Sequence, residues 1–188
     1  FNHEAVAVDP HRKQLYLTED KPDGRLYRFT PKSYPDLTSG ILEVMRIVDE
    51  EFGSTEWLKI SDPTAVTLAT RKQAPSSTPF NGGEGIWYHS GIIYFSTKGD
   101  NRVWGYETIS GMLNIIYDQN FSCTPILSGV DNLAVSPGGD ILVAEDGGDL
   151  EIISLHTREA LKNIDSITTE TDNEEVLGII FSKFCIGK

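Results

Sequence analysis

Residues 4–20 read EAVAVDPHRKQLYLTED: an acid, an apolar segment, a turn that contains proline, and a second apolar segment that ends on two acids. Alternating and β-branched apolar residues in both segments are typical of short β-strands. The same design returns as EGIWYHSGIIYFSTKGD at 84–100 and as DNLAVSPGGDILVAED at 131–146. A fourth copy opens at Glu175 with EVLGI. The sequence therefore contains an internal repeat of strand hairpins.

The spacing of these copies predicts the fold. Their first acids are 80, 47 and 44 residues apart. Further strand-like segments follow the first two hairpins, at 25–29, 42–48, 102–107 and 113–118. A period near 45 residues with about four strands per unit is typical of β-propeller blades. We therefore predict an all-β, β-propeller-like fold of about three four-stranded blades plus the start of a fourth, which is a partial or open propeller.

This pattern also predicts the domain organisation. We expect residues 1–188 to form a single propeller-type domain that is a fragment of a larger propeller, because propellers have roughly four to eight blades. The long first interval indicates a loop insertion at 71–83, where Pro, Ser, Thr, Asn and Gly accumulate. An open arc of blades exposes strand edges, so we expect self-association through them.

Composition excludes several classes of function. Lys and Arg number 16 against 28 Asp and Glu, which gives a formal net charge of −12. This charge argues against nucleic acid and against an anionic membrane surface, because both need clustered cations. The sequence has no apolar run long enough to span a membrane and no targeting signal at its start. Two cysteines, Cys123 and Cys185, are too few for a disulfide scaffold, and their pairing stays open.

The repeated acids are the candidate functional residues. Innermost strands of successive blades line a shared channel, so equivalent positions on them face one another. Converging carboxylates repel unless their pKa values rise or a cation neutralises them, and hard oxygen ligands favour Ca²⁺, Mg²⁺ or a trivalent ion. The predicted metal ligands are Glu4, Glu84, Asp131 and Glu145, and the additional candidates are Glu19, Lys98, His3 and Glu175.

The alternative is that these acids are solvated turn residues, as acids at strand starts often are. Asp20, Asp100 and Asp146 follow the second strands, and we interpret them as turn-shaping residues. Lys98 could steer a phosphate or balance charge. The tryptophans at 57, 87 and 104 are predicted to pack between blades. The sequence lacks a G-x-S-x-G, an H-E-x-x-H, a P-loop and zinc-type cysteine spacing, which disfavours serine-hydrolase, nucleotide-binding and zinc sites.

Six strings in order resemble the PhoX-type alkaline phosphatases and their bacterial relatives. They are FNHEAVAVDP at 1–10, YLTED at 16–20, GRLYRF at 24–29, GEGIW at 83–87, TKGDNRVW at 97–104, and DNL at 131–133 continuing to ILVAEDG at 141–147. The resemblance implies a six-bladed propeller that is exported to the periplasm or secreted. It also implies hydrolysis of small phosphomonoesters with calcium and ferric iron as cofactors, and metal-ligand roles for Glu4 and Glu84.

Two departures from the family pattern affect the expected activity. The family has a Cys ligand upstream of its His-Glu motif, and this chain has no residue at that place. Gly82 stands where the family has a phosphate-contacting Arg. We therefore expect a metal-dependent phosphatase relative whose activity is impaired or absent in this chain, with its catalytic residues unknown. The alternatives are a non-catalytic propeller scaffold and a calcium-dependent lactonase-like hydrolase that uses Glu84, Asn132 and Asp131.

Overall fold

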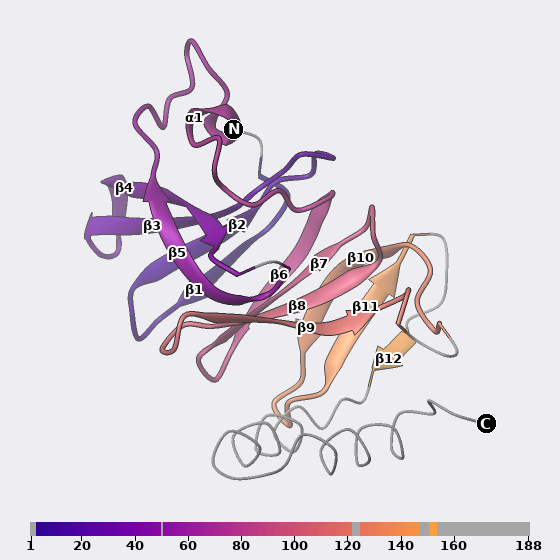
Figure 1. Cartoon of the computed structure of the whole chain (residues 1–188). Coiled ribbons are helices and arrows are strands. Elements are labelled where there is room, and N and C mark those ends of the chain that lie inside the picture. The colour runs from indigo at the N-terminus through magenta and orange to yellow at the C-terminus, as the bar shows by residue number, and fades with distance from the viewer. Residues whose placement is uncertain (1–2, 50, 122–124, 147–150, 154–188) are drawn as a thin grey trace, which may run out of the picture.

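The computed structural model describes residues 3–49, 51–121, 125–146 and 151–153 (Figure 1). These residues form an all-β fold with one short helix. The strands are β1 (Val6–Asp9), β2 (Gln14–Thr18), β3 (Leu26–Ser33), β4 (Asp36–Ile47), β5 (Gly53–Lys59), β6 (Gly83–His89), β7 (Ile92–Thr97), β8 (Arg102–Glu107), β9 (Met112–Asp118), β10 (Val130–Val135), β11 (Ile141–Glu145) and β12 (Glu151–Ile153), and the helix is α1 (Thr70–Gln73).

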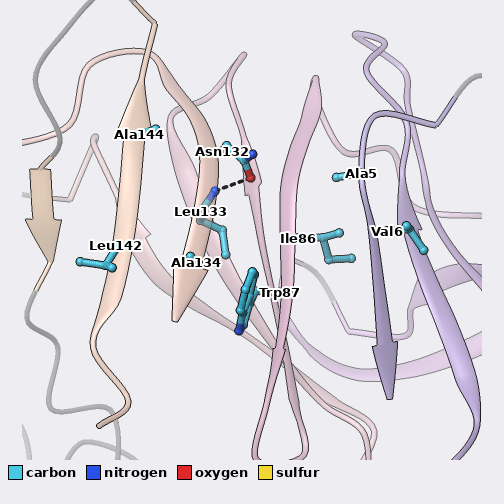
Figure 2. Close-up of a pocket in the computed structure, with 9 residues that line it drawn as sticks. All are labelled: Ala5, Val6, Ile86, Trp87, Asn132, Leu133, Ala134, Leu142 and Ala144. Carbon is cyan, nitrogen blue, oxygen red and sulfur yellow. Dashed lines mark hydrogen bonds between the residues drawn. The ribbon is translucent and has the colours of Figure 1, made fainter. Parts of the chain in front are cut away.

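The strands form three antiparallel meanders in chain order. The first runs from β1 to β5, the second from β6 to β9 and the third from β10 to β12. Their first strands lie against one another, β1 beside β6 and β6 beside β10 (Figure 2). Successive meanders that meet through their first strands have the arrangement of propeller blades. The prediction of an all-β, propeller-like partial ring is confirmed.

The number of strands per unit differs from the prediction. The first unit has a fifth strand, β5, whose sequence GSTEWLK lacks the period-two alternation that marks a strand. It pairs with β4 along Thr55–Lys59 and with β9 at Gly53 and Ser54, so the first two units share one nine-stranded sheet. The predicted fourth unit at Glu175 lies outside the described residues.

Aromatic side chains fill the space between the first two units. Trp57 of β5 packs edge-on against Tyr16 and Tyr106, and its indole N–H donates to the Tyr106 hydroxyl at 3.0 Å. Trp104 is buried, as predicted. Trp87 is less enclosed than predicted, because its side chain is 43% exposed in the space between β6 and β10.

Residues 60–82 connect β5 to β6 and carry α1. Phe80 fixes the end of this segment: its N–H donates to the Gly24 carbonyl at 2.9 Å, and its ring packs edge-on against Phe95 and Trp104. The buried ring holds the chain in place immediately before β6 begins. Over the part of the chain described here, no helix is long and apolar enough to cross a membrane.

Candidate functional site

Three carboxylates converge where the first two units meet. Glu4 precedes β1, Asp20 follows β2, and Glu84 is the second residue of β6. One carboxylate oxygen from each lies within 4.8 Å of the other two. Glu4 is exposed, Asp20 is half-buried and Glu84 is buried. Residues far apart in sequence thus form one acidic cluster at a common end of β1, β2 and β6.

A bulge in β6 places Glu84 in this cluster. Gly83 pairs with Thr97 and Ile86 pairs with Phe95, so Glu84 and Gly85 together oppose the single residue Ser96. Such a bulge breaks the strict alternation of side chains along a strand and redirects one of them. The strand β10 has the same irregularity, where Asp131 and Asn132 oppose Ala144.

The start of β1 repeats the two-against-one arrangement. Glu4 N–H donates to the Thr18 carbonyl at 2.9 Å, and Thr18 N–H donates to the Ala5 carbonyl at 3.2 Å. Two residues immediately before β1 therefore share one residue of β2. The recurring acids Glu4, Glu84 and Asp131 all occupy this irregular position, which explains why they keep their register.

Gly85 allows β6 and β10 to approach closely. A Cβ at this position would lie 2.4 Å from the Leu133 nitrogen and 2.5 Å from the Asn132 side-chain oxygen. Real Cβ atoms do not tolerate such distances, so only glycine fits without moving β10. The close approach brings Asp131 toward Glu84, and this geometry links the third unit to the acidic cluster.

Lys98 supplies the cation nearest to these carboxylates. It follows β7, and its Nζ forms an ion pair with Glu84 Oε1 and lies 3.3 Å from Asp20 Oδ2. Glu84 Oε1 is buried, and Lys98 is its ion-pair partner among the described residues. The sequence left open whether Lys98 steers a phosphate or balances charge, and its contacts with Glu84 and Asp20 fit charge balance.

The environment raises the pKa of Glu84 to about 6. Burial is the largest cause, and the charges of Asp20 and Asp131 add to it, while the nearby ammonium of Lys98 opposes it. The two carboxylates raise the pKa of Lys98 in turn. The cluster thus carries more negative charge than one lysine compensates, and a further cation would relieve the imbalance.

The structure separates the predicted candidates into groups. Glu4 and Glu84 come together, and Asp131 lies close enough to influence the pKa of Glu84 without joining the cluster. The Glu145 carboxylate instead accepts from the Ser128 backbone N–H. His3 is exposed beside Glu4, and Glu175 lies outside the described residues.

Glu19 has a different environment from its neighbour in sequence. Its buried carboxylate accepts from the Tyr27 hydroxyl and from Arg71, each at 3.0 Å. Asp20 takes the place in the cluster that the sequence pattern had indicated for Glu19. An Asp follows the second strand in all three copies, but in the second copy the Asp100 carboxylate turns back to accept from Thr97. Asp20 instead pairs with Lys98 in the cluster, and this proximity is visible only in the fold.

An apolar groove of about 430 Å³ is lined by residues of β1, β6, β10 and β11 and by the residue before β1 (Figure 2). Ala5 and Asn132, which follow Glu4 and Asp131 in sequence, are among its lining residues. Trp87 lies across its middle, between the strands that carry Ile86 and Leu133. Two of the lining residues, Ala5 and Ile86, thus lie within two positions of cluster acids in the sequence.

Comparison with known proteins identifies the family. The model of the family described as alkaline phosphatase PhoX matches residues 1–120. The chain belongs to the PhoX family. The match contains Glu4, Asp20, Glu84 and Lys98, so the three carboxylates and the lysine beside them lie in the PhoX part of the chain.

Curated relatives match over smaller fractions of their length. The tRNA modification GTPase MnmE of Jannaschia sp. (strain CCS1) is 28% identical over 133 residues, which cover 71% of this chain and 29% of that protein. The MnmE of Geobacter metallireducens is 45% identical over 42 residues, 22% of this chain and 9% of that protein. The MnmE of Chlamydia pneumoniae is 55% identical over 38 residues, 20% and 9% respectively. The chain thus spans under a third of the length of these relatives, and matches of this extent do not establish a function.

Proposed function

We propose that this chain is a metal-dependent phosphomonoester hydrolase relative whose cation site is built on Glu4, Asp20 and Glu84. One observation carries the proposal: three carboxylates from separate strands converge within 4.8 Å in a chain of the PhoX alkaline phosphatase family. Asp131 of β10 lies outside the cluster, and its charge adds to the negative potential at Glu84. Glu145 and Glu19 take no part in it, because each has another partner.

The donor set fits a hard cation. All three ligands are carboxylates, and the most buried of them, Glu84, has a single lysine as its ion-pair partner. Oxygen ligands of this kind suit calcium or ferric iron better than metals that prefer thiolates. A bound cation would polarise a phosphoryl oxygen and offset the charge that develops during hydrolysis.

The chain's own residues have separate tasks in this proposal. Glu84 is the fixed ligand, because it lies on a bulged and buried strand. Lys98 is 39% exposed, so its side chain has room to leave the carboxylates when a metal arrives. Its ammonium would then contact a phosphate oxygen as a point charge. Gly82 provides no guanidinium, so substrate charge is compensated less well than with the family's Arg, and we expect slow turnover.

The groove gives this proposal a substrate class. Its apolar walls and the exposed face of Trp87 would accept the organic part of a small phosphate ester while the phosphate meets the cluster. Aryl phosphates suit this surface better than short polar esters, since a ring can stack on the indole. We also extend to this chain the export that is typical of PhoX proteins, so its substrate would be encountered outside the cytoplasm.

Cation binding is the first test. Tb³⁺ and Ca²⁺ titrated against the purified chain should raise its melting temperature, and Glu84→Gln should abolish most of this rise. Glu56→Gln is the matched control, because Glu56 pairs with Arg46 on the surface, away from the cluster. Equal stabilisation of both variants, or none of the unsubstituted chain, would contradict the proposed site.

Hydrolysis of p-nitrophenyl phosphate with calcium and iron present is the second test. Slow, metal-dependent release of nitrophenol that is lost in Glu84→Gln supports a hydrolase. A non-catalytic scaffold would instead release none, and Glu4→Gln and Glu84→Gln would leave its ligand binding unchanged.

A further inference from the structure

Two buried hydroxyl groups connect each unit to the acid of the next. Thr18 Oγ1, at the end of β2, donates to the backbone carbonyl of Glu84 at 2.5 Å. Ser96 Oγ, near the end of β7, donates to the backbone carbonyl of Asp131 at 2.6 Å. Both donors are at most 1% exposed. The same bond therefore occurs twice, each time from one unit to the acid-bearing residue of the following unit.

The two hydroxyls occupy equivalent positions. Thr18 is the single residue opposite Glu4 and Ala5, and Ser96 is the single residue opposite Glu84 and Gly85. Each hydroxyl also contacts its own bulge: Ala5 N–H donates to Thr18 Oγ1 at 3.3 Å, and the Gly85 carbonyl lies 3.4 Å from Ser96 Oγ. One side chain thus joins the bulge of its own unit to the bulge of the next.

This connection acts on the residue that carries the carboxylate. A hydrogen bond to the carbonyl of Glu84 restrains the peptide unit next to its Cα, and its Cα–Cβ direction follows. The Glu84 side chain has few accessible rotamers, because it is buried and because the next residue, Gly85, packs against β10. Restraining the backbone therefore restrains the carboxylate.

We infer that Thr18 and Ser96 are positioning residues: Thr18 holds Glu84 in the cation site, and Ser96 holds Asp131 beside it. The inference rests on the cation site proposed above. Neither hydroxyl contacts the cation in this proposal. They act through the backbone of the next unit, and residues one step beyond the ligands commonly change metal affinity by roughly 10–100-fold.

Thr18→Val tests the inference with little change of shape, because valine replaces the hydroxyl with a methyl group. The control is Thr55→Val: Thr55 Oγ1 donates to the Gly111 carbonyl at 2.8 Å, also between the first two units but in β5. Both variants lose one bond from a hydroxyl to a carbonyl, so we expect similar losses of thermal stability. Tb³⁺ affinity, followed by sensitised luminescence, should fall about tenfold in Thr18→Val and stay unchanged in Thr55→Val.

Two further variants complete the series. Thr18→Ser keeps the hydroxyl and should restore Tb³⁺ affinity to within about threefold of the unsubstituted chain. Ser96→Ala should weaken affinity less than Thr18→Val, because Asp131 lies outside the three-carboxylate cluster.

The outcomes separate this inference from the proposed function. If the unsubstituted chain binds Tb³⁺ and Thr18→Val binds it equally well, the positioning role is wrong while the cation site stands. If Thr18→Ser is as weak as Thr18→Val, loss of packing rather than loss of the hydroxyl is responsible, and the inference is again wrong. If the unsubstituted chain binds no Tb³⁺, both proposals fall.

Discussion

Glu84 is the residue on which the site depends most. It is buried, belongs to a bulge, and is paired with one lysine that it shares with Asp20. Its acidic neighbours and its burial act in the same direction on its pKa. A buried carboxylate with a raised pKa destabilises the fold when it is charged. A role in binding a cation would explain why the protein keeps a carboxylate at this position.

The raised pKa of Glu84 predicts how stability depends on pH. The pKa is about 6 in the fold against 4.5 for an ordinary Glu, so the folded state holds this proton more tightly than the unfolded state. The associated stability is present below pH 4.5 and is lost as the pH rises through 6. Relative to Glu84→Gln, the chain should lose about 1 kcal/mol between these limits, measured by urea unfolding at each pH.

Carboxylates with lowered pKa values, such as Asp23, act in the opposite direction and at lower pH, so the two effects are distinguishable. A difference between the two proteins that stays constant from pH 4.5 to 7 would contradict the assignment to Glu84.

Arg71 is predicted to matter more for stability than the more exposed Arg46. Its guanidinium bonds the carboxylate of Glu19, which is 2% exposed, so Arg71→Met would leave a buried charge with only the Tyr27 hydroxyl. We expect a loss of about 2–3 kcal/mol in the free energy of unfolding. Arg46→Met breaks a pair that is nearly half exposed on both sides and should cost about 0.5 kcal/mol. Chemical denaturation measures the free energy of unfolding of both variants. Equal losses in Arg71→Met and Arg46→Met would show that buried Glu19 does not need the charge of Arg71.

At the scale of elements, the first strands of the units determine the site. The sequence pattern predicted that Glu4 and Glu84 would share one end of these strands, because a repeat keeps its register. It did not predict Asp20, because the contact with Lys98 comes from packing between units rather than from spacing. It also missed β5, because the sequence of this strand does not alternate and the strand is defined by its pairing with β4 and β9.

The packing of β6 on β10 gives a prediction at this scale. Gly85→Ala would force a Cβ into the Leu133 backbone and should lower the free energy of unfolding by about 2–3 kcal/mol. Gly138→Ala is the control, because its Cβ would meet neighbours only at 3.5 Å, and it should change stability by no more than about 0.5 kcal/mol. Thermal unfolding of both variants is the measurement, and tolerance of Gly85→Ala would mean that the two strands can separate without cost.

For the whole molecule, the open ring leaves apolar surface on β1 and β6. Val6, Val8 and Trp87 are 46%, 40% and 43% exposed on these strands. Apolar residues grouped in this way favour association, so the average mass in sedimentation velocity should rise with protein concentration. Val8→Lys should reduce the rise.

Val66→Lys is the matched control for that experiment. Val66 is 82% exposed but lies in the 60–82 segment, away from these strands. It should leave association unchanged, and a similar effect of both lysines would indicate that net charge rather than the β1 surface governs the mass.

The three carboxylates of the cluster differ in freedom, and this bears on ion selectivity. Glu84 is held by its bulge, by the buried Thr18 hydroxyl and by the strand beside it, whereas Glu4 is exposed and precedes the first strand. A site with one fixed ligand, Glu84, and one mobile ligand, Glu4, could bind ions of different radius with a similar free-energy cost, because Glu4 can adjust its position. Such a site would discriminate by charge more strongly than by size, and it would accept calcium and a smaller trivalent ion in turn.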